Sequence, residues 1–260
     1  MMGAIAGDII GSRFERKRSP PPDFDLFHPR CRFTDDTVCT VAVADALMGS
    51  GDFAARLRDF CRRHPRRGYG GLFRGWVWTD NAPAYGSWGN GAPMRVSSIG
   101  WLAETRAQAL ALAEAQAIVT HDHPEAVAAA QSVVLAIWLL RRGEHAAVVR
   151  AQIEEAFSYD LEPERALAID YVRVHARATV VPVLAAALSA GDWEAVVRRV
   201  IALGGDADTA ASIAGAVAEA RFGMPAAVVD TARAYLTDDL AAVAEAFARR
   251  AVRPGAPSHG

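Results

Sequence analysis

The sequence predicts an all-α fold, arranged as a single compact multi-helix domain, and three observations support this prediction. Several long segments carry apolar residues at helical spacing. Alternation of apolar and polar residues, which marks a half-buried strand, is almost absent. The 260 residues suffice for one large domain with a sizeable core. We therefore expect residues 1–252 to form this domain and residues 253–260 to be a flexible tail.

The clearest helix follows Asp192, which is a favoured N-cap, and ends before Gly204, a favoured C-terminal stop. Its apolar residues lie on one helical face: Trp193, Val196, Val197, Val200 and Ile201. Six further segments are predicted to be helical: Glu104–Val119, Pro124–Arg142, Val148–Phe157, Pro182–Ser189, Ala210–Phe222 and Leu240–Val252. The segment Leu72–Trp78 is ambiguous between helix and strand. Two segments, Arg16–Arg30 and Asp80–Pro93, are rich in helix-breaking residues and are predicted to be long loops.

Composition and charge exclude several classes of function. A formal net charge of −2 and 52% hydrophobic residues are typical of a soluble globular protein. The chain lacks the excess of basic residues that nucleic-acid-binding proteins usually carry. The one basic cluster, Cys61–Gly70, we interpret as a solvated loop rather than a phosphate-binding patch. Three cysteines without metal-type spacing fit a reducing compartment. No apolar run reaches the ~20 residues that a membrane span needs. We expect a cytoplasmic monomer with no membrane contact.

Two helix starts carry more acid than a cap requires. The segments Thr34–Thr37 (TDDT) and Asp206–Thr209 (DADT) each precede an apolar helical run. Aspartate and threonine are favoured caps, and carboxylates suit the positive end of the helix dipole, but one cap needs only one such residue. Four carboxylates in one buried site would repel each other unless cations compensate them. Oxygen ligands suit hard ions such as Mg²⁺ or Mn²⁺, so the two segments, if they meet, predict a dinuclear metal site.

Five motifs follow one another along the chain: GAIAGDIIGSRFE, FTDDT, GNGAPMRV, THDHPEA and LGGDADT. In this order and approximate spacing they resemble the ADP-ribosylglycohydrolase family, whose best-known bacterial member reactivates dinitrogenase reductase. The resemblance runs from Gly3 to about Gly223. It implies an all-α fold with two divalent cations, Mg²⁺ or Mn²⁺. It also implies hydrolysis of the bond between the anomeric carbon of ADP-ribose and an acceptor, which is a protein side chain, a nucleobase or a small molecule.

The resemblance assigns metal-binding and catalytic roles residue by residue. The implied metal ligands are Thr34, Asp35, Asp36, Asp206, Asp208 and Thr209. The implied catalytic residues are Glu15, Asp35 and Asp36. The glutamate that matches Glu15 in relatives lies near the scissile bond and gates access to the metals, and Asp35 or Asp36 would orient or deprotonate the attacking water. We interpret Asp8, in the GD pair of the first motif, as structural.

The resemblance also implies a loop that cradles ADP-ribose. The residues that it assigns to substrate binding are Ser87, Gly89, Asn90, Gly91, Arg95 and His121. The two glycines permit close approach of backbone N–H groups to a pyrophosphate. His121 matches a histidine that contacts the phosphate or distal ribose region, and Arg95 would neutralise charge or brace the loop. Four aromatic residues are candidates for stacking on adenine: Trp76, Trp78, Tyr85 and Trp88.

Three questions stay open at this point. The stretch Val174–Pro182 departs from the family pattern in a region that shapes the acceptor side in relatives, so the leaving group is undetermined. A metal-dependent phosphoesterase would use the same ligands to cut the pyrophosphate of a nucleotide. A non-catalytic ADP-ribose-binding or structural relative would keep the fold without turnover.

Overall fold

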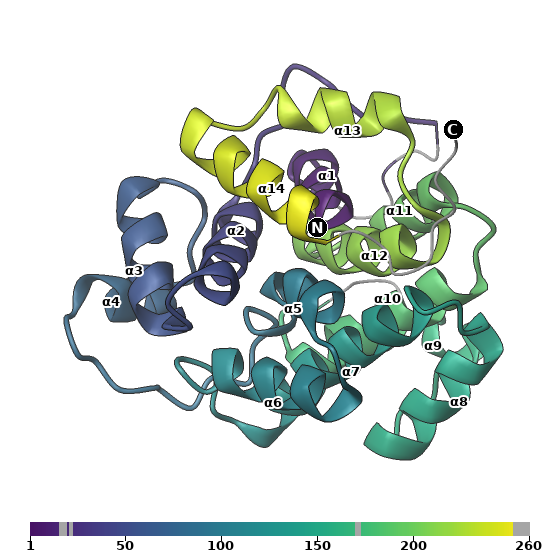
Figure 1. Ribbon diagram of the computed structural model, residues 1–260. Coiled ribbons are helices and arrows are strands. Elements are labelled where there is room, and N and C mark those ends of the chain that lie inside the picture. The colour runs from purple at the N-terminus through teal and green to yellow at the C-terminus, as the bar shows by residue number, and fades with distance from the viewer. Residues whose placement is uncertain (16–19, 21–22, 170–172, 252–260) are drawn as a thin grey trace.

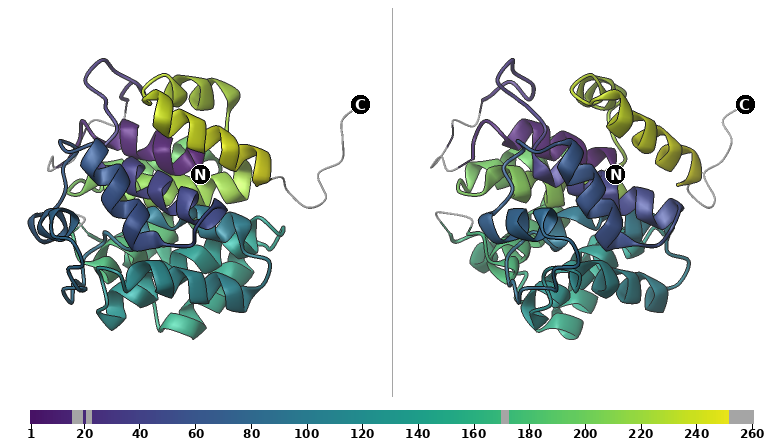
Figure 2. Two further views of the ribbon diagram at one scale, coloured as in Figure 1. Left: turned by 60° about the vertical axis from the view of Figure 1, so that its left-hand side comes forward. Right: turned by 90° about the vertical axis from the view of Figure 1, so that its left-hand side faces the viewer.

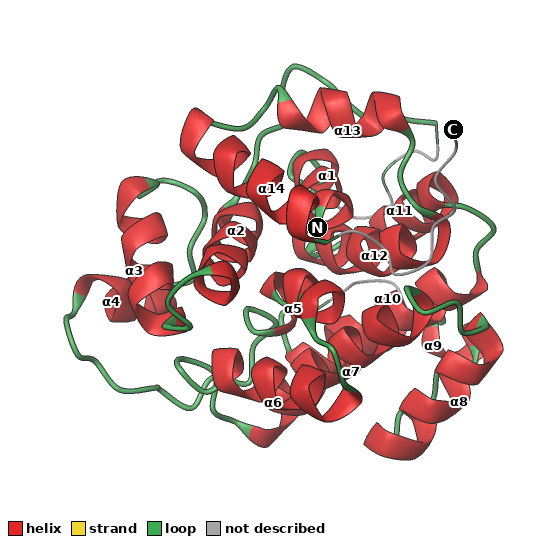
Figure 3. Cartoon of the chain, viewed as in Figure 1, coloured by secondary structure: helices red, strands yellow, loops and turns green. Residues whose placement is uncertain are grey.

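The computed structural model describes residues 1–15, 20, 23–169 and 173–251, and over these residues it confirms the all-α prediction. Figure 3 shows helices joined by loops, and the described part of the chain contains no strand beyond one isolated bridge between Gly89 and His175. The predicted tail, residues 253–260, lies outside the described residues. None of the described helices is long and apolar enough to cross a membrane.

The helices in chain order are α1 (Met2–Gly11), α2 (Asp35–Met48), α3 (Phe53–Arg63), α4 (Gly71–Trp78), the short 3-10 helix η1 (Pro93–Arg95), α5 (Ser97–Leu102), α6 (Arg106–Ala117), α7 (Pro124–Leu140), α8 (Ala146–Phe157), α9 (Pro163–Ala166), α10 (Ala176–Ser189), α11 (Trp193–Ala202), α12 (Ala207–Phe222), α13 (Ala226–Arg233) and α14 (Asp238–Arg250). Helix α12 packs against α1, α7, α10 and α11, so it lies at the centre of the domain (Figure 1). Helix α13 packs on α1 and α14 on α2, and Figure 2 shows both on the side opposite α6 and α7.

Helices α1 and α12 pack with their backbones in contact, because small residues line the seam between them. Gly3, Gly7 and Gly11 recur at every fourth position of α1 and so share one face. A Cβ atom on Gly7 would overlap the carbonyl oxygen of Ala211, and one on Gly11 would overlap the backbone at the start of α12. The end of α1 therefore lies against the beginning of α12, which brings Asp8 close to the second acid segment.

Most helix predictions agree with the structure to within a few residues. The predicted cap of α11 is confirmed, since Asp192 Oδ1 accepts a hydrogen bond from Ala195 N at 2.8 Å. The ambiguous segment Leu72–Trp78 is helical. The predicted helix start at Pro182 is wrong, because α10 begins at Ala176 and contains Pro182 in its interior. Proline favours a helix start, but within a buried, well-packed helix the loss of one backbone hydrogen bond is tolerated.

A candidate metal centre at the floor of an acidic cavity

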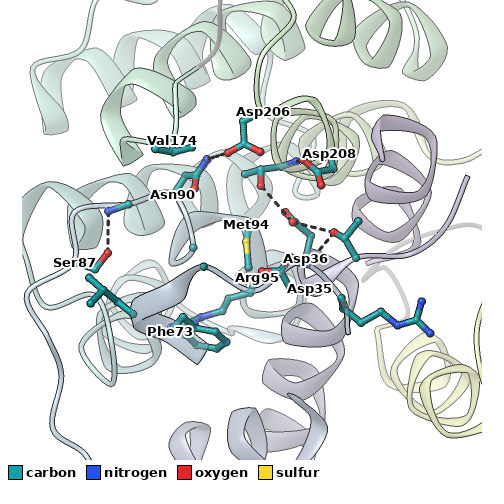
Figure 4. A pocket seen from close by; sticks show the side chains of 18 of the residues that line it. Asp35, Asp36, Phe73, Ser87, Asn90, Met94, Arg95, Val174, Asp206 and Asp208 are labelled. Atoms are coloured by element: carbon teal, nitrogen blue, oxygen red, sulfur yellow. Dashed lines mark hydrogen bonds between the residues drawn. The ribbon is translucent and has the colours of Figure 1, made fainter. Parts of the chain in front are cut away.

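A cavity of about 490 Å³ opens where the starts of α2 and α12 meet the loop that precedes η1. All six predicted metal ligands line this cavity: Thr34, Asp35, Asp36, Asp206, Asp208 and Thr209. The six predicted substrate-binding residues line it as well: Ser87, Gly89, Asn90, Gly91, Arg95 and His121. Figure 4 shows the four aspartates on one side of the cavity and Ser87 with Val174 farther along it. Residues that are distant in sequence thus form one site.

The two acid segments meet directly, as the metal hypothesis required. Thr209 Oγ1 donates a hydrogen bond to Asp36 Oδ2 at 3.3 Å across 173 residues of sequence. Asp36, Asp208 and Thr209 are buried, whereas Asp35 and Asp206 are partly exposed to the cavity. The start of α2 and the start of α12 therefore point their carboxylates at the same small volume.

Helix capping explains only part of this arrangement. Thr34 is the N-cap of α2, and its side chain accepts a hydrogen bond from Asp36 N at 3.3 Å. Asp206 occupies the N-cap position of α12 but makes no capping hydrogen bond, and its carboxylate instead accepts one from Asn90 Nδ2 at 2.7 Å. Gly204 and Gly205 have φ values of 71° and 85°, in the left-handed region that favours glycine, and they turn the chain sharply into α12. The second acid segment is thus arranged for the cavity rather than for the cap.

Asp8 anchors the first acid segment from behind. Its carboxylate is fully buried and accepts hydrogen bonds from the backbone N–H and the hydroxyl group of both Thr34 and Thr37. These four donors occupy most of the lone pairs that a carboxylate offers. The structural interpretation of Asp8 therefore agrees with its contacts. Because the Thr34 hydroxyl proton goes to Asp8 Oδ1 at 2.6 Å, a lone pair of Thr34 Oγ1 remains available to a ligand in the cavity.

The aspartates at the cavity floor raise one another's pKa values, because each carboxylate charge disfavours the next. Desolvation by burial, followed by repulsion from Asp208, holds the pKa of Asp36 well above its usual range. The pKa of Asp208 is raised well above its usual range by burial and then by Asp206. Burial, with repulsion from Asp8 and Asp206, raises the pKa of Asp35 to about 7. Such mutual destabilisation of charged forms is what bound divalent cations relieve.

The donor set fits hard divalent cations. Carboxylate oxygens of Asp36 and Asp208 lie within 4.8 Å of one another, with an oxygen of the structural Asp8 within the same distance of both. Asp36 Oδ1 is buried with no hydrogen-bond partner in the described residues. An orphaned carboxylate oxygen in an all-oxygen cluster is a natural ligand for Mg²⁺ or Mn²⁺. The cluster can therefore hold metal ions, and nothing in its chemistry selects one ion over the other.

Asn90 ties the predicted cradle loop to the acid cluster. Besides its contact with Asp206, its Nδ2 donates to Thr179 Oγ1 at 3.1 Å, and its backbone N–H donates to the carbonyl oxygen of Val174 at 2.9 Å. Together with the bridge between Gly89 and His175, these bonds fix the loop against the start of α10. The Val174–Pro182 stretch, expected on the acceptor side, thus contacts the cradle loop.

A hydrogen-bond chain sets the orientation of His121. Arg95 is fully buried and donates to Gln116 Oε1 at 2.7 Å and to Thr120 Oγ1 at 2.9 Å, so it braces the loop. The Thr120 hydroxyl forms a hydrogen bond of 2.8 Å with His121 Nδ1. Burial, followed by the charge of Arg95, lowers the pKa of His121 to about 3, so its ring is neutral. His121 Nε2 lies only 2.8 Å from the position that a Cβ atom on Gly91 would take, so any larger residue at position 91 would displace the ring.

Glu15 lines the same cavity, at the end of the turn that follows α1. Its charge contributes to the raised pKa of both Asp35 and Asp208, which places it near both acid segments. The residues alone favoured a solvent-facing acid beside Arg16 and Lys17, and only the family resemblance reversed that preference. The cavity position is the one that the family resemblance implies.

Several other predictions about the cavity need correction. Trp76 is buried under the Arg58 guanidinium, 3.8 Å from its ring centroid, and does not line the cavity; neither do Trp78 and Trp88. Of the predicted stacking residues only Tyr85 lines it. The basic cluster Cys61–Gly70 is not simply a solvated loop, because it begins inside α3 and its later residues Arg67, Gly68 and Gly70 line the cavity.

Sequence reasoning also missed five lining residues, which are Arg32, Gly71, Leu72, Phe73 and Met94. Phe73 lies in the first turn of α4, directly after the glycine-rich run RRGYGG. That run was the available signal, since glycines at a loop next to a basic cluster permit close approach of a ligand.

The comparisons with known proteins agree with this geometry. The family model of ADP-ribosylglycohydrolase matches residues 1–257. A solved structure described as an "ADP-ribosylglycohydrolase-related protein complex" shares the fold, with a TM-score of 0.74 and 23% sequence identity over 96% of this chain and 97% of that chain. The family match spans nearly the whole chain and supports a glycohydrolase activity on ADP-ribose. This chain belongs to the ADP-ribosylglycohydrolase family.

Proposed function

We propose that the protein is a Mg²⁺- or Mn²⁺-dependent ADP-ribosyl hydrolase, which cleaves the bond between the anomeric carbon of ADP-ribose and an acceptor and releases ADP-ribose. The observation that carries the proposal is the contact between Asp36 and Thr209. It joins both acid segments at the floor of one cavity, whose other wall is the cradle loop. Family membership supplies the substrate class.

In this proposal the ligands of two cations are Thr34, Asp35, Asp36, Asp206, Asp208 and Thr209. Bound divalent cations would supply positive charge that compensates the carboxylates and polarises a water and the ribose hydroxyls. Asp36, buried and orphaned at Oδ1, acts as a ligand. Asp35 is more exposed to the cavity, and this favours it as the carboxylate that orients the water.

The bond changes follow from hydrolysis at an anomeric carbon. The water oxygen attacks this carbon while the bond to the acceptor breaks, through a state with oxocarbenium character. Asp35 or Asp36 accepts a proton of the water, and Glu15 assists transfer of a proton to the departing acceptor. The carboxylates around the carbon stabilise its developing positive charge.

The cradle residues bind the rest of ADP-ribose in this proposal. Gly89 lets the backbone approach the ligand closely, and the backbone N–H group of Gly91 donates a hydrogen bond to a pyrophosphate oxygen. Neutral His121, in the tautomer that carries its proton on Nε2, donates a second one. Asn90 holds Asp206 in place, so it positions a metal ligand as well as the loop. Ser87 adds a hydroxyl group beside Gly89, whose N–H it already accepts at 3.2 Å.

The test incubates the protein with ADP-ribosylated acceptors in Mg²⁺ or Mn²⁺ and identifies the products by mass spectrometry. We expect release of ADP-ribose, loss of turnover with chelator, and loss of Mn²⁺ binding with retained helical content in Asp36→Asn. Release of AMP would indicate the phosphoesterase instead. Full activity of metal-free protein would contradict the proposal, and tight ADP-ribose binding without turnover would indicate a non-catalytic relative.

A further inference from the structure

Two arginines line the cavity beside the first acid segment. Arg32 precedes Thr34 by two residues and is exposed, and Arg67 lines the cavity from the loop after α3. The carbonyl oxygen of Arg67 accepts a hydrogen bond from Asp35 N at 2.9 Å, which fixes this loop beside the aspartates. Neither the hydrolytic step nor the cradle uses these two side chains.

Arg67 is held in place rather than free to swing into solvent. Its guanidinium carbon lies 3.6 Å from the centroid of the Phe33 ring, and its Nη1 donates to the carbonyl oxygen of Phe33 at 3.5 Å. No ion pair among the described residues involves Arg32 or Arg67. The positive charge of both arginines therefore remains available to a ligand.

The three arginines that line the cavity differ in how far a ligand can reach them. Arg95 is fully buried, and its Nε and Nη2 are bound to Gln116 and Thr120. Arg32 is exposed and Arg67 is half-buried, so their guanidinium groups can meet an entering ligand. If two cations compensate the four aspartates, the carboxylates that remain near these two arginines are those of Glu15, which lines the cavity, and of Asp8, which is buried behind Thr34.

Our inference builds on the proposed hydrolase function. With the ribose held at the aspartates and the ADP portion running along the cradle, Arg32 and Arg67, which line the cavity beside the first acid segment, are placed to meet the acceptor. We propose that these two arginines form the leaving-group subsite and that they select acceptors with an anionic group, a phosphate or a carboxylate, next to the ribosyl bond. Guanidinium groups bind such oxyanions well, whereas a cationic acceptor such as arginine would meet two like charges.

The first experiment compares kcat/KM for three compounds in which ADP-ribose carries a different leaving group. These are ADP-ribose 1″-phosphate, ADP-ribosyl-serine and ADP-ribosyl-arginine, which have anionic, neutral and cationic acceptors. We expect the wild type to prefer the 1″-phosphate over the arginine compound by tenfold or more. In the Arg32→Gln/Arg67→Gln double variant this preference should disappear, while Arg66→Gln, a neighbouring exposed arginine outside the cavity, should behave like the wild type.

The second experiment measures binding and needs no turnover. In the Glu15→Gln background with Mn²⁺, calorimetry should show that ADP-ribose 1″-phosphate binds at least tenfold more tightly than ADP-ribose. The advantage should be lost when Arg32 and Arg67 are both replaced by glutamine, with the affinity for ADP-ribose unchanged. This binding experiment reports on the arginine subsite alone. It therefore tests the inference even if the protein does not hydrolyse the proposed substrates.

Three results would overturn the inference. One is equal binding of the two ligands to the Glu15→Gln protein. Another is a loss of ADP-ribose affinity in Arg67→Gln, which would mean that the arginines serve the diphosphate. A third is control of acceptor preference by Val174→Ser rather than by the arginines, which would place the leaving group at the opposite wall.

Discussion

Replacement of Asp35 by asparagine tests the electrostatic account of the cavity floor in metal-free protein. Burial and neighbouring carboxylates raise the pKa of Asp35 from 3.8 to about 7 in the folded protein. A folded-state pKa above the unfolded value means that the folded state holds the proton more tightly. The corresponding stability is fully present below about pH 4 and is lost as the pH rises through 7. Asparagine has no such proton to lose.

The size of the effect follows from the two pKa values. A difference of about 3 units corresponds to about 4 kcal/mol at about 1.36 kcal/mol per unit, and more than half of it develops between pH 5 and pH 8. Solvent in the cavity screens the partly exposed carboxyl and reduces the effect by about half. We therefore expect metal-free wild type to lose about 1–2 kcal/mol more than Asp35→Asn between these two pH values.

Urea unfolding of chelator-treated protein at pH 5 and pH 8 measures this difference. Asp23→Asn, at an exposed position outside the cavity, is the matched control and should keep the pH dependence of the wild type. Addition of Mn²⁺ at pH 8 should stabilise the wild type more than Asp35→Asn, because the cation compensates a charge that the variant lacks. Identical pH dependence of wild type and Asp35→Asn would refute the reasoning.

Three further predictions concern packing, the cradle and catalysis. Gly7→Ala places a methyl group against the α12 backbone and should lower the free energy of unfolding by about 1–3 kcal/mol, measured in urea, whereas Gly75→Ala, in open space on α4, should cause no loss. Gly91→Ala displaces the His121 ring and should weaken ADP-ribose binding tenfold or more in calorimetry; unchanged affinity in a folded variant would make the loop an ordinary turn. Glu15→Gln should lower turnover by roughly 10²-fold, with the affinity for ADP-ribose retained. Near-normal turnover would mean that Glu15 is a solvent-facing acid without a catalytic role.

The helices were predictable because their signals are local. The apolar spacing after Asp192 and its capping side chain lie within one segment, and the structure reproduces both. Helices α3 and α13 were not anticipated. The start of α10 was misplaced by six residues, because a proline inside a buried helix is tolerated only through tertiary contacts that the sequence does not display.

The site was predictable in its chemistry and not in its assembly. Residue types alone identified two acid-rich helix starts that favour oxygen-seeking cations, and the family resemblance assigned their roles. The geometry that joins them, with Thr209 bonded to Asp36, depends on how α12 lies against its neighbours. The hydrogen bond from Asp35 N to the carbonyl oxygen of Arg67 likewise joins backbone atoms, which carry no residue-specific signal.

The sequence by itself predicted the fold class and the family, which the structure and the comparisons confirm, and it supplied the candidate residues for the chemistry. Only the tertiary structure decided that Asp8 stands behind the candidate metal ligands, that Arg95 holds Thr120 beside His121, and that Arg67 reaches the cavity. The physical reason is the difference in range between the two kinds of information. Helical periodicity and caps act over a few residues, whereas the cavity exists because glycines on α1 let its backbone meet α12 across some two hundred residues of chain.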